Sequence, residues 1–379
     1  MNPDLLSTIG LSVVGAAAAA VILRQFRQPP LLGYILGGVL LGPRAFGLIT
    51  DQHSVELISH IGLILLLFII GLEIDLPKLF RAGRSITVLG FFQFPLCLAL
   101  AYGGAAVFFP DLSTMSRLYI AAGLSLSSTM IVVKLLHDKL EISSHAGRLT
   151  VGVLVFQDVW AIALISIQPS LGNPAWGMLA ASLGWGVALV LVATLLARTV
   201  LPKLFERIAM SPELTIVVAV AWCFAVAGAA GAAGLSREMG ALVAGASMAP
   251  LAYSSEIVAK LGGIRDFFVC LFFVALGLQV PPLTGTLLAQ AGACALIVLL
   301  SRVLVIMPLM RMVKGDVRHG ALVAINLSQV SEFSLVLAML GVSFGHIGPD
   351  VAGLVLVSLL LTALMSTYLI KDNHRIAAW

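Results

Sequence analysis

The nonapeptide LLLFIIGLE, at Leu65–Glu73, recurs as LFFVALGLQ at Leu271–Gln279, an offset of 206 residues. Each copy lies in an apolar run of about 20 residues, long enough to cross a hydrocarbon core of roughly 30 Å as a helix. Similar runs recur from Leu5 to Ile370. Because backbone polar groups find no partner in lipid, such runs must be helical. The sequence therefore predicts an all-α polytopic membrane protein that contains an internal repeat.

Composition supports a membrane protein. Hydrophobic residues make up 60% of the chain and charged residues 11%, whereas soluble domains are about half apolar and a quarter charged. The runs are too long and too uniformly apolar for barrel strands. The first run, Leu5 to Leu23, has no basic region before it, so we expect a retained span and no signal peptide. The four cysteines lie inside apolar runs, which favours a packing role over disulfides or a metal site.

We predict thirteen transmembrane helices, at 5–23, 30–49, 54–74, 86–109, 115–136, 147–168, 175–197, 214–233, 238–253, 263–279, 284–310, 318–344 and 350–370. The odd-numbered loops and the C-terminal tail hold 18 of the 22 Lys and Arg residues. Basic residues concentrate in cytoplasmic loops of membrane proteins. The N-terminus is therefore expected outside and the C-terminus in the cytoplasm.

Two further matches extend the repeat. Gly33, Gly38 and Pro43 recur as Gly240, Gly245 and Pro250, and Leu126-Ser127-Ser128 resembles Leu327-Ser328-Gln329. Spans 1–6, at about 5–168, would repeat as spans 8–13, at about 214–370, with 175–197 as a connector. An offset of seven spans reverses the direction of corresponding helices. This predicts an inverted repeat, an architecture typical of secondary transporters.

Ionisable residues inside spans cost about 2.5–3.5 kcal/mol each, so each is a functional candidate. The candidates are Asp158, Arg302 and Glu332, with Glu73 nearer a helix end. A secluded Asp158, with Gln157 beside it, could hold either a proton or a monovalent cation, although a structural carboxylate paired to a basic group is the alternative. Arg302 stays protonated and cannot deliver protons. We expect it to form a structural ion pair with Glu332.

Spans 5 and 12 have polar centres at corresponding repeat positions, Ser125–Thr129 and Asn326–Glu332. Hydroxyl groups there could simply bond to their own helix backbone. The paired positions favour two interrupted helices whose ends meet at an ion site. The ion-binding residues predicted there are Ser127, Ser128, Thr129, Ser328 and Gln329.

Enzyme functions find little support. The chain has no HExxH metal motif and no phosphate-binding loop, so we predict no catalytic residues, no cofactor, no metal other than a transported monovalent cation and no nucleic-acid partner. A channel would need a filter of backbone carbonyls, and no TVGYG-like string is present. A sodium-coupled organic-anion symporter can share an inverted repeat, but favours a roomier polar cavity.

Four strings resemble those of Kef-type potassium/proton antiporters, in the cation:proton antiporter-2 family: Gly71–Asp75, Leu126–Thr129, Phe156–Asp158 and Leu327–Phe333. The resemblance implies a six-helix core domain with two crossed broken helices, a dimerisation domain, a homodimer and a bacterial inner membrane location. It also implies Asp158 as the carrier, with Gln157 where other branches have Asp or Asn. Arg302 would replace a lysine or arginine near the core. Potassium is preferred over sodium on this resemblance alone.

The chain also departs from that family. Kef proteins usually continue into a cytoplasmic nucleotide-binding domain, and this chain ends at Trp379, so a regulatory nucleotide is expected only if a further domain exists. The loop at Tyr253–Ile257 lacks the histidine-bearing string of glutathione-regulated members. With Gln157 neutral and the charge of Arg302 fixed, one carrier would exchange one proton for one cation.

Overall fold

The computed structural model describes residues 5–26, 28–43, 45–49, 52–73, 83–171, 176–208, 212–233, 235, 237–251, 253–278 and 280–377. The described elements are all helical. They divide into two compact units. Unit 1 comprises Met1–Asp75 and Ile165–Gln279, and unit 2 comprises Leu76–Leu164 and Val280–Trp379.

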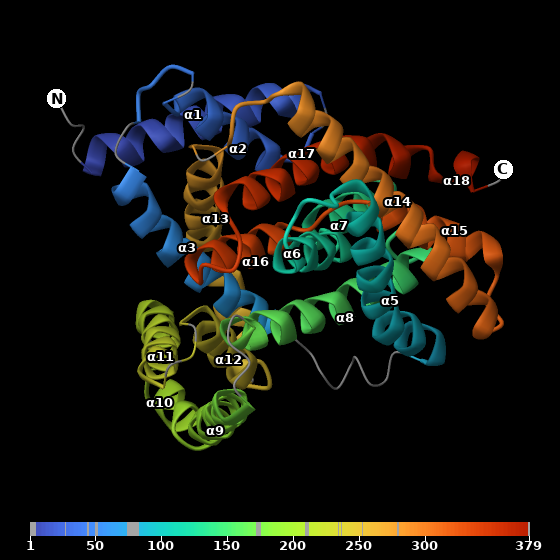
Figure 1. Cartoon of the computed structure of the whole chain (residues 1–379). Coiled ribbons are helices and arrows are strands. Elements are labelled where there is room, and N and C mark those ends of the chain that lie inside the picture. Colours follow the sequence, from blue (N-terminus) through green and yellow to red (C-terminus); the bar gives the residue numbers. More distant parts are fainter. Residues whose placement is uncertain are drawn as a thin grey trace. The chain divides into compact units, whose positions relative to one another are not determined.

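Unit 1 contains α1 (Leu5–Gln25), α2 (Pro30–Leu41), α3 (Gln52–Glu73), η1 (Gln168–Ser170), α9 (Trp176–Thr199), α10 (Leu201–Ile208), α11 (Pro212–Ala232), α12 (Arg237–Met248) and α13 (Ser254–Leu278). Unit 2 contains α5 (Arg84–Phe108), α6 (Thr114–Ser125), α7 (Thr129–Asp138), α8 (His145–Ile167), α14 (Gly285–Met312), α15 (Val317–Asn326), α16 (Glu332–Ser343), α17 (Pro349–Lys371) and α18 (Asn373–Ile376) (Figure 1).

Each of the thirteen predicted segments coincides with a helix or a pair of helices, but three predicted ranges were wrong. The segment 238–253 is helical only to Met248, the last residue of α12. The segment 30–49 is helical only to Leu41, because Gly42 and Pro43 follow it. The segment 263–279 begins earlier, since α13 starts at Ser254. The charged stretch before 263 is helical, and within it Lys260 and Glu256 form an ion pair one turn apart, which favours a helix by a few tenths of a kcal/mol.

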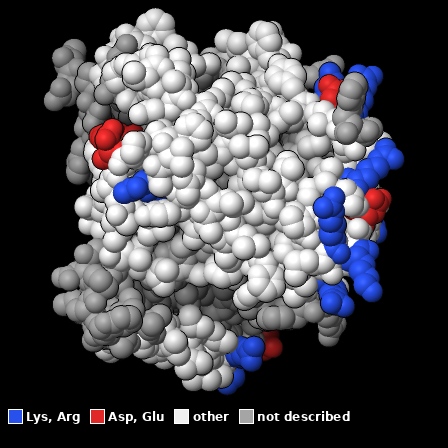
Figure 2. Space-filling view, turned by 45° about the vertical axis from the view of Figure 1, so that its right-hand side comes forward, with Lys and Arg blue, Asp and Glu red and all other residues white. Residues whose placement is uncertain are grey.

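Within the described residues, seven helices are long and apolar enough to cross a membrane, or eight if the bent pair in α13 counts as one span. The helices α2, α12 and α16 are apolar but have only 10–17 residues. The face drawn in Figure 2 agrees with a membrane protein, because it is largely uncharged and Lys and Arg gather at its margin. The chain is therefore an integral membrane protein with several spans.

Unit 1 contains two helix crossings in which backbones touch. A Cβ atom added to Gly38 of α2 would lie 2.2 Å from the carbonyl oxygen of Val274 on α13. A Cβ atom added to Gly245 of α12 would lie 2.0 Å from the carbonyl oxygen of Phe68 on α3. Glycine permits so close an approach because it has no side chain. Both contacts join repeat-related positions, since Gly38 corresponds to Gly245 and Phe68 to Val274.

The helices of unit 2 follow the repeat in order. The helices α5, α6–α7 and α8 correspond to α14, α15–α16 and α17, and the first residues of α5 and α14 are Arg84 and Gly285, an offset of 201. Helices α14 and α17 pack together in the unit, as do α6 and α16.

Helix ends that carry basic residues meet at one end of unit 2, which we call the basic end. Lys139, which follows α7, donates to the carbonyl oxygen of Ile370 near the end of α17. The rings of His145, at the start of α8, and His319, in α15, are 4.9 Å apart. These helix ends belong to odd-numbered loops or to the tail, as the sequence predicts for one side of the membrane.

Candidate cation site at the crossing of two broken helices

Two helices of unit 2 are interrupted at their centres, as the sequence predicts. Residues 126–128 separate α6 from α7, and residues 327–331 separate α15 from α16. We call residues 126–128 the first break and residues 327–331 the second break. The backbone at Ser128 and Ser331 is extended. Each of these serines begins the next helix by accepting a hydrogen bond, Ser128 from the N–H of Ile131 and Ser331 from that of Phe333. A side chain that replaces helix bonds at its own N-cap favours such a restart.

The two breaks touch each other. The Ser127 hydroxyl donates to the carbonyl oxygen of Leu327 at 2.8 Å. The Gln329 amide donates to the carbonyl oxygen of Ser128 at 3.5 Å. Ser127, Ser128 and Gln329, three of the predicted ion-binding residues, therefore lie together although they are about 200 residues apart in sequence.

Arg302 of α14 joins both breaks and is fully buried. Its Nε donates to the carbonyl oxygen of Leu327 at 3.0 Å, and its Nη2 donates to that of Leu124 at 2.9 Å. These carbonyls lie at the C-terminal ends of α15 and α6, where each helix dipole leaves a partial negative charge of about half an elementary charge. The guanidinium therefore neutralises two helix ends at once.

The sequence predicts a carboxylate as the partner of Arg302, but the described partners are uncharged oxygens. Its described hydrogen bonds go to backbone carbonyls and to the Ser127 hydroxyl. Glu332 is buried in the first turn of α16, where the helix dipole favours its negative charge. The ion pair between Arg302 and Glu332 stays a prediction.

Gln157 of α8 holds the first break from the other side. Its Oε1 accepts a hydrogen bond from the backbone N–H of Ser127 at 2.7 Å. Its Nε2 donates to Oε1 of Gln93 on α5, also at 2.7 Å. The next residue is Asp158, which is partly buried and turned by about 100° around the helix. The predicted carrier therefore lies beside a residue that is bonded to the first break.

The second break is held in a similar way. The backbone N–H of Val330 donates to the hydroxyl of Thr362 on α17 at 3.1 Å. Thr362 in turn donates to the carbonyl oxygen of Ser358 one turn earlier. In each repeat, the helix that follows the broken one supplies a side-chain acceptor to a backbone N–H of the break. Sequence reasoning missed both residues, because Gln93 is one amide in an apolar stretch of α5 and Thr362 is one of four Ser and Thr residues on α17.

The remaining predicted residues differ in whether their side-chain groups already form a described hydrogen bond. The Ser328 hydroxyl donates back to the carbonyl oxygen of Ala324 at 2.6 Å, which is the local alternative to ion binding. In contrast, Oγ1 of Thr129 and Oε1 of Gln329 are buried and have no hydrogen-bond partner among the described residues. Unpaired buried oxygens are rare in proteins and often mark a missing ligand or water.

Glu73 belongs to unit 1, as the last residue of α3. Its side chain lies outside the described part of the chain, so its predicted role is untested.

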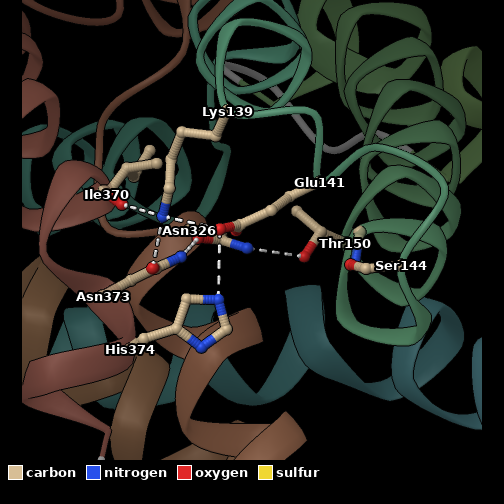
Figure 3. Close-up of polar contacts among 9 residues, drawn as sticks. Lys139, Glu141, Ser144, Thr150, Asn326, Ile370, Asn373 and His374 are labelled. Atoms are coloured by element: carbon tan, nitrogen blue, oxygen red, sulfur yellow. Dashed lines mark hydrogen bonds and ion pairs between the residues drawn. The ribbon is translucent and has the colours of Figure 1, made fainter.

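A second polar cluster lies at the basic end of unit 2 (Figure 3). Lys139 donates to Oδ1 of Asn373 at 2.6 Å and pairs with Glu141 at 3.0 Å. Asn373 donates to Asn326, the last residue of α15, and Asn326 donates to Thr150 of α8. This cluster ties the end of α15 to the helix that carries Asp158, and both asparagines are buried.

Comparison with known proteins assigns the chain to a family. The model of the family described as "Sodium/hydrogen exchanger, transmembrane" matches residues 10–371. The chain belongs to the sodium/hydrogen exchanger family. Family membership makes it a transporter and not an enzyme, in agreement with the sequence prediction.

Three curated relatives are similar over most of this chain. The K(+) efflux antiporter 5 of Arabidopsis thaliana is 27% identical over 88% of the chain, which spans 60% of that relative's length. The K(+)/H(+) antiporter subunit KhtU of Bacillus subtilis is 27% identical over 97% of the chain and 93% of its own length. The iron transporter MagA of Paramagnetospirillum magneticum is 27% identical over the whole chain and 88% of its own length.

A solved structure has a similar fold. The sodium proton antiporter MjNhaP1 of Methanocaldococcus jannaschii superposes with a TM-score of 0.71, covering 99% of this chain and 98% of that one, at 18% identity. The likeness shows that the two chains share a fold.

Proposed function

We propose that the chain is a secondary transporter that exchanges a monovalent cation for protons by alternating access, with Asp158 as the carrier of both. One observation carries the proposal. The crossing of the two breaks combines a fixed guanidinium, two unpartnered buried oxygens and, on α8, a carboxylate next to Gln157. Arg302 offsets the helix ends. The carboxylate of Asp158 is the group that we propose to bind a proton and a cation in turn.

The ligands that we propose for the cation are Asp158, Thr129 and Gln329. Carboxylate, hydroxyl and amide oxygens are hard ligands suited to alkali cations. Ser127 has a different role in this proposal. Its hydroxyl donates to Leu327 and accepts from Arg302 and Gln157, which uses its proton and both lone pairs. Ser127 therefore holds the crossing together instead of binding the ion.

The proposed architecture is an inverted repeat of thirteen spans, with the N-terminus outside and the C-terminus in the cytoplasm of a bacterium. Unit 2 would be the transporting core, because it contains six of the predicted spans and both breaks. Unit 1 would be the scaffold through which two copies form a homodimer. The glycine crossings, which recur at repeat-related positions, support the internal symmetry.

Potassium is our first choice of cation, because two relatives are named for potassium and one of these names also includes protons. The test is a pH-sensitive dye trapped in proteoliposomes, to which K⁺, Na⁺, Fe²⁺ or an organic anion is added. Saturable proton movement on addition of K⁺ or Na⁺ supports antiport. Proton movement with Fe²⁺ alone, or uptake of the anion without proton release, would contradict the proposal.

The stoichiometry is tested in the same vesicles. A single titratable carrier that exchanges one H⁺ for one K⁺ moves no net charge. Exchange should then be unchanged, within about twofold, when the membrane potential is set between zero and about −100 mV, a step worth about 2.3 kcal/mol per transported charge. A steep response to the potential would contradict the one-for-one cycle.

A further inference from the structure

Gln93 is a fully buried amide at the middle of α5, a helix whose surrounding residues are apolar. Its Oε1 accepts from Gln157, and its Nε2 donates to Sγ of Cys97 at 3.2 Å. A buried amide costs free energy unless it is hydrogen-bonded. The hydrogen bond that Oε1 of Gln93 accepts from Gln157 therefore explains why an amide occurs in this apolar helix.

The bond from Gln157 to Gln93 fixes which way the Gln157 amide faces. The backbone N–H of Ser127 requires an acceptor, so the Gln157 oxygen must point toward the break and its NH₂ group away from it. The NH₂ group then needs an acceptor of its own. Gln93 supplies one at 2.7 Å, whereas the Ser127 hydroxyl, at 3.3 Å, is already shared with Arg302.

The second repeat shows why this extra residue is needed. Thr362 reaches the N–H of Val330 with a short side chain, and its hydroxyl is anchored to its own helix at Ser358. Gln157 does the equivalent task with a side chain that has three rotatable bonds. A long side chain loses more rotamer entropy when it is held in one geometry. Gln93 compensates for this flexibility from a neighbouring helix.

We infer that Gln93 is a positioning residue for the cation site: by holding the amide of Gln157, it sets the geometry of the first break, which Thr129 directly follows. This inference rests on the proposed function. It predicts an effect mainly on cation affinity, because Gln93 touches neither Asp158 nor the unpartnered oxygens through any described contact. A loosened break offers its oxygens in more than one arrangement, and binding then costs more ordering.

The test compares Gln93→Met with Gln93→Glu in reconstituted vesicles. Methionine has a similar shape but no acceptor oxygen, so the apparent KM for the cation should rise about tenfold, the size of one hydrogen bond, while kcat changes less than threefold. Glutamate in its uncharged form keeps an acceptor oxygen at the same reach and one donor, so it should restore KM to within about twofold of wild type. The control Cys97→Ala removes the other partner of Gln93 and should leave KM within twofold.

The outcomes separate this inference from the proposed function. If Gln93→Met leaves KM unchanged in a protein whose wild type exchanges cations, Gln93 has no positioning role and the exchanger proposal stands. Equal losses in Gln93→Met and Gln93→Glu would also overturn the inference, because the acceptor would then be irrelevant. Should Gln93→Met fail to fold, Gln93→Asn, one methylene too short to reach Gln157, provides the same comparison. If the wild type shows no exchange, the proposed function itself fails.

Discussion

Units 1 and 2 each contain crossing helices, but they are held together differently. In unit 1 the crossings at Gly38 and Gly245 bring backbone against backbone with no side chain between them. In unit 2 the crossing of the two breaks is held by the side chains of Arg302, Gln157 and Ser127. A glycine contact specifies one close-packed geometry. A polar crossing leaves charges and oxygens that an ion can use, and this difference is what we would expect between a scaffold and a transporting core.

The largest effect is predicted for Arg302→Met. Loss of the guanidinium leaves the carbonyl oxygens of Leu124 and Leu327 buried without this donor, at about 1–3 kcal/mol each. We expect exchange to fall to the background and the thermal midpoint in detergent to drop by several degrees. Arg302→Lys should recover part of the stability, since one ammonium cannot reproduce the planar fork. A thermal midpoint of Arg302→Met equal to that of the wild type would contradict the claim that side-chain hydrogen bonds hold the crossing in unit 2 together.

The second effect concerns the glycine contact in unit 1. A methyl group at Gly245 would meet the backbone oxygen of Phe68, which cannot move as a side chain can. Gly245→Ala should therefore lower the free energy of unfolding by about 1–3 kcal/mol, as overpacking does. The control is Gly228→Ala on α11, where an added Cβ has open space; it should stabilise slightly, by up to about 1 kcal/mol. Similar thermal midpoints for the two variants would show that the crossing is not tight.

The smallest effect is a pH dependence at the end of unit 2 opposite the basic end. His346, in the loop after α16, shares a 2.8 Å hydrogen bond with Tyr119 of α6, and burial lowers the pKa of His346 below its ordinary value of 6.5. The unfolded chain then binds the proton more readily than the folded one. Stability should be full above pH 6.5 and fall as the pH drops from 6.5 toward the lowered folded value.

His346→Gln removes this titration. Thermal midpoints at pH 7.5 and 5.5 should differ less in His346→Gln than in the wild type. Glycine crossings contain no titratable group, so Gly245→Ala should keep the wild-type pH dependence. An identical pH dependence in wild type and His346→Gln would rule out this contribution.

The sequence predicted the interrupted helices well, because a break needs serine caps and small polar groups that stand out in an apolar span. It did not predict the partners of Arg302, since backbone carbonyls leave no trace in residue identity. Gln93 and Thr362 were missed because an isolated amide or a helix hydroxyl indicates nothing until its neighbour across the bundle is known. The start of α13 was predicted too late because charged residues suggested a loop, although two of them form an ion pair on the helix.

The central claim is that Asp158 carries both the proton and the cation. The most direct measurement is K⁺-driven proton movement in proteoliposomes that contain Asp158→Asn, alongside wild type reconstituted at the same density. Asparagine keeps the shape but cannot exchange a proton, so we predict no movement above that of protein-free liposomes, with a thermal midpoint within about two degrees of wild type. Saturable exchange by a folded Asp158→Asn protein would contradict the account.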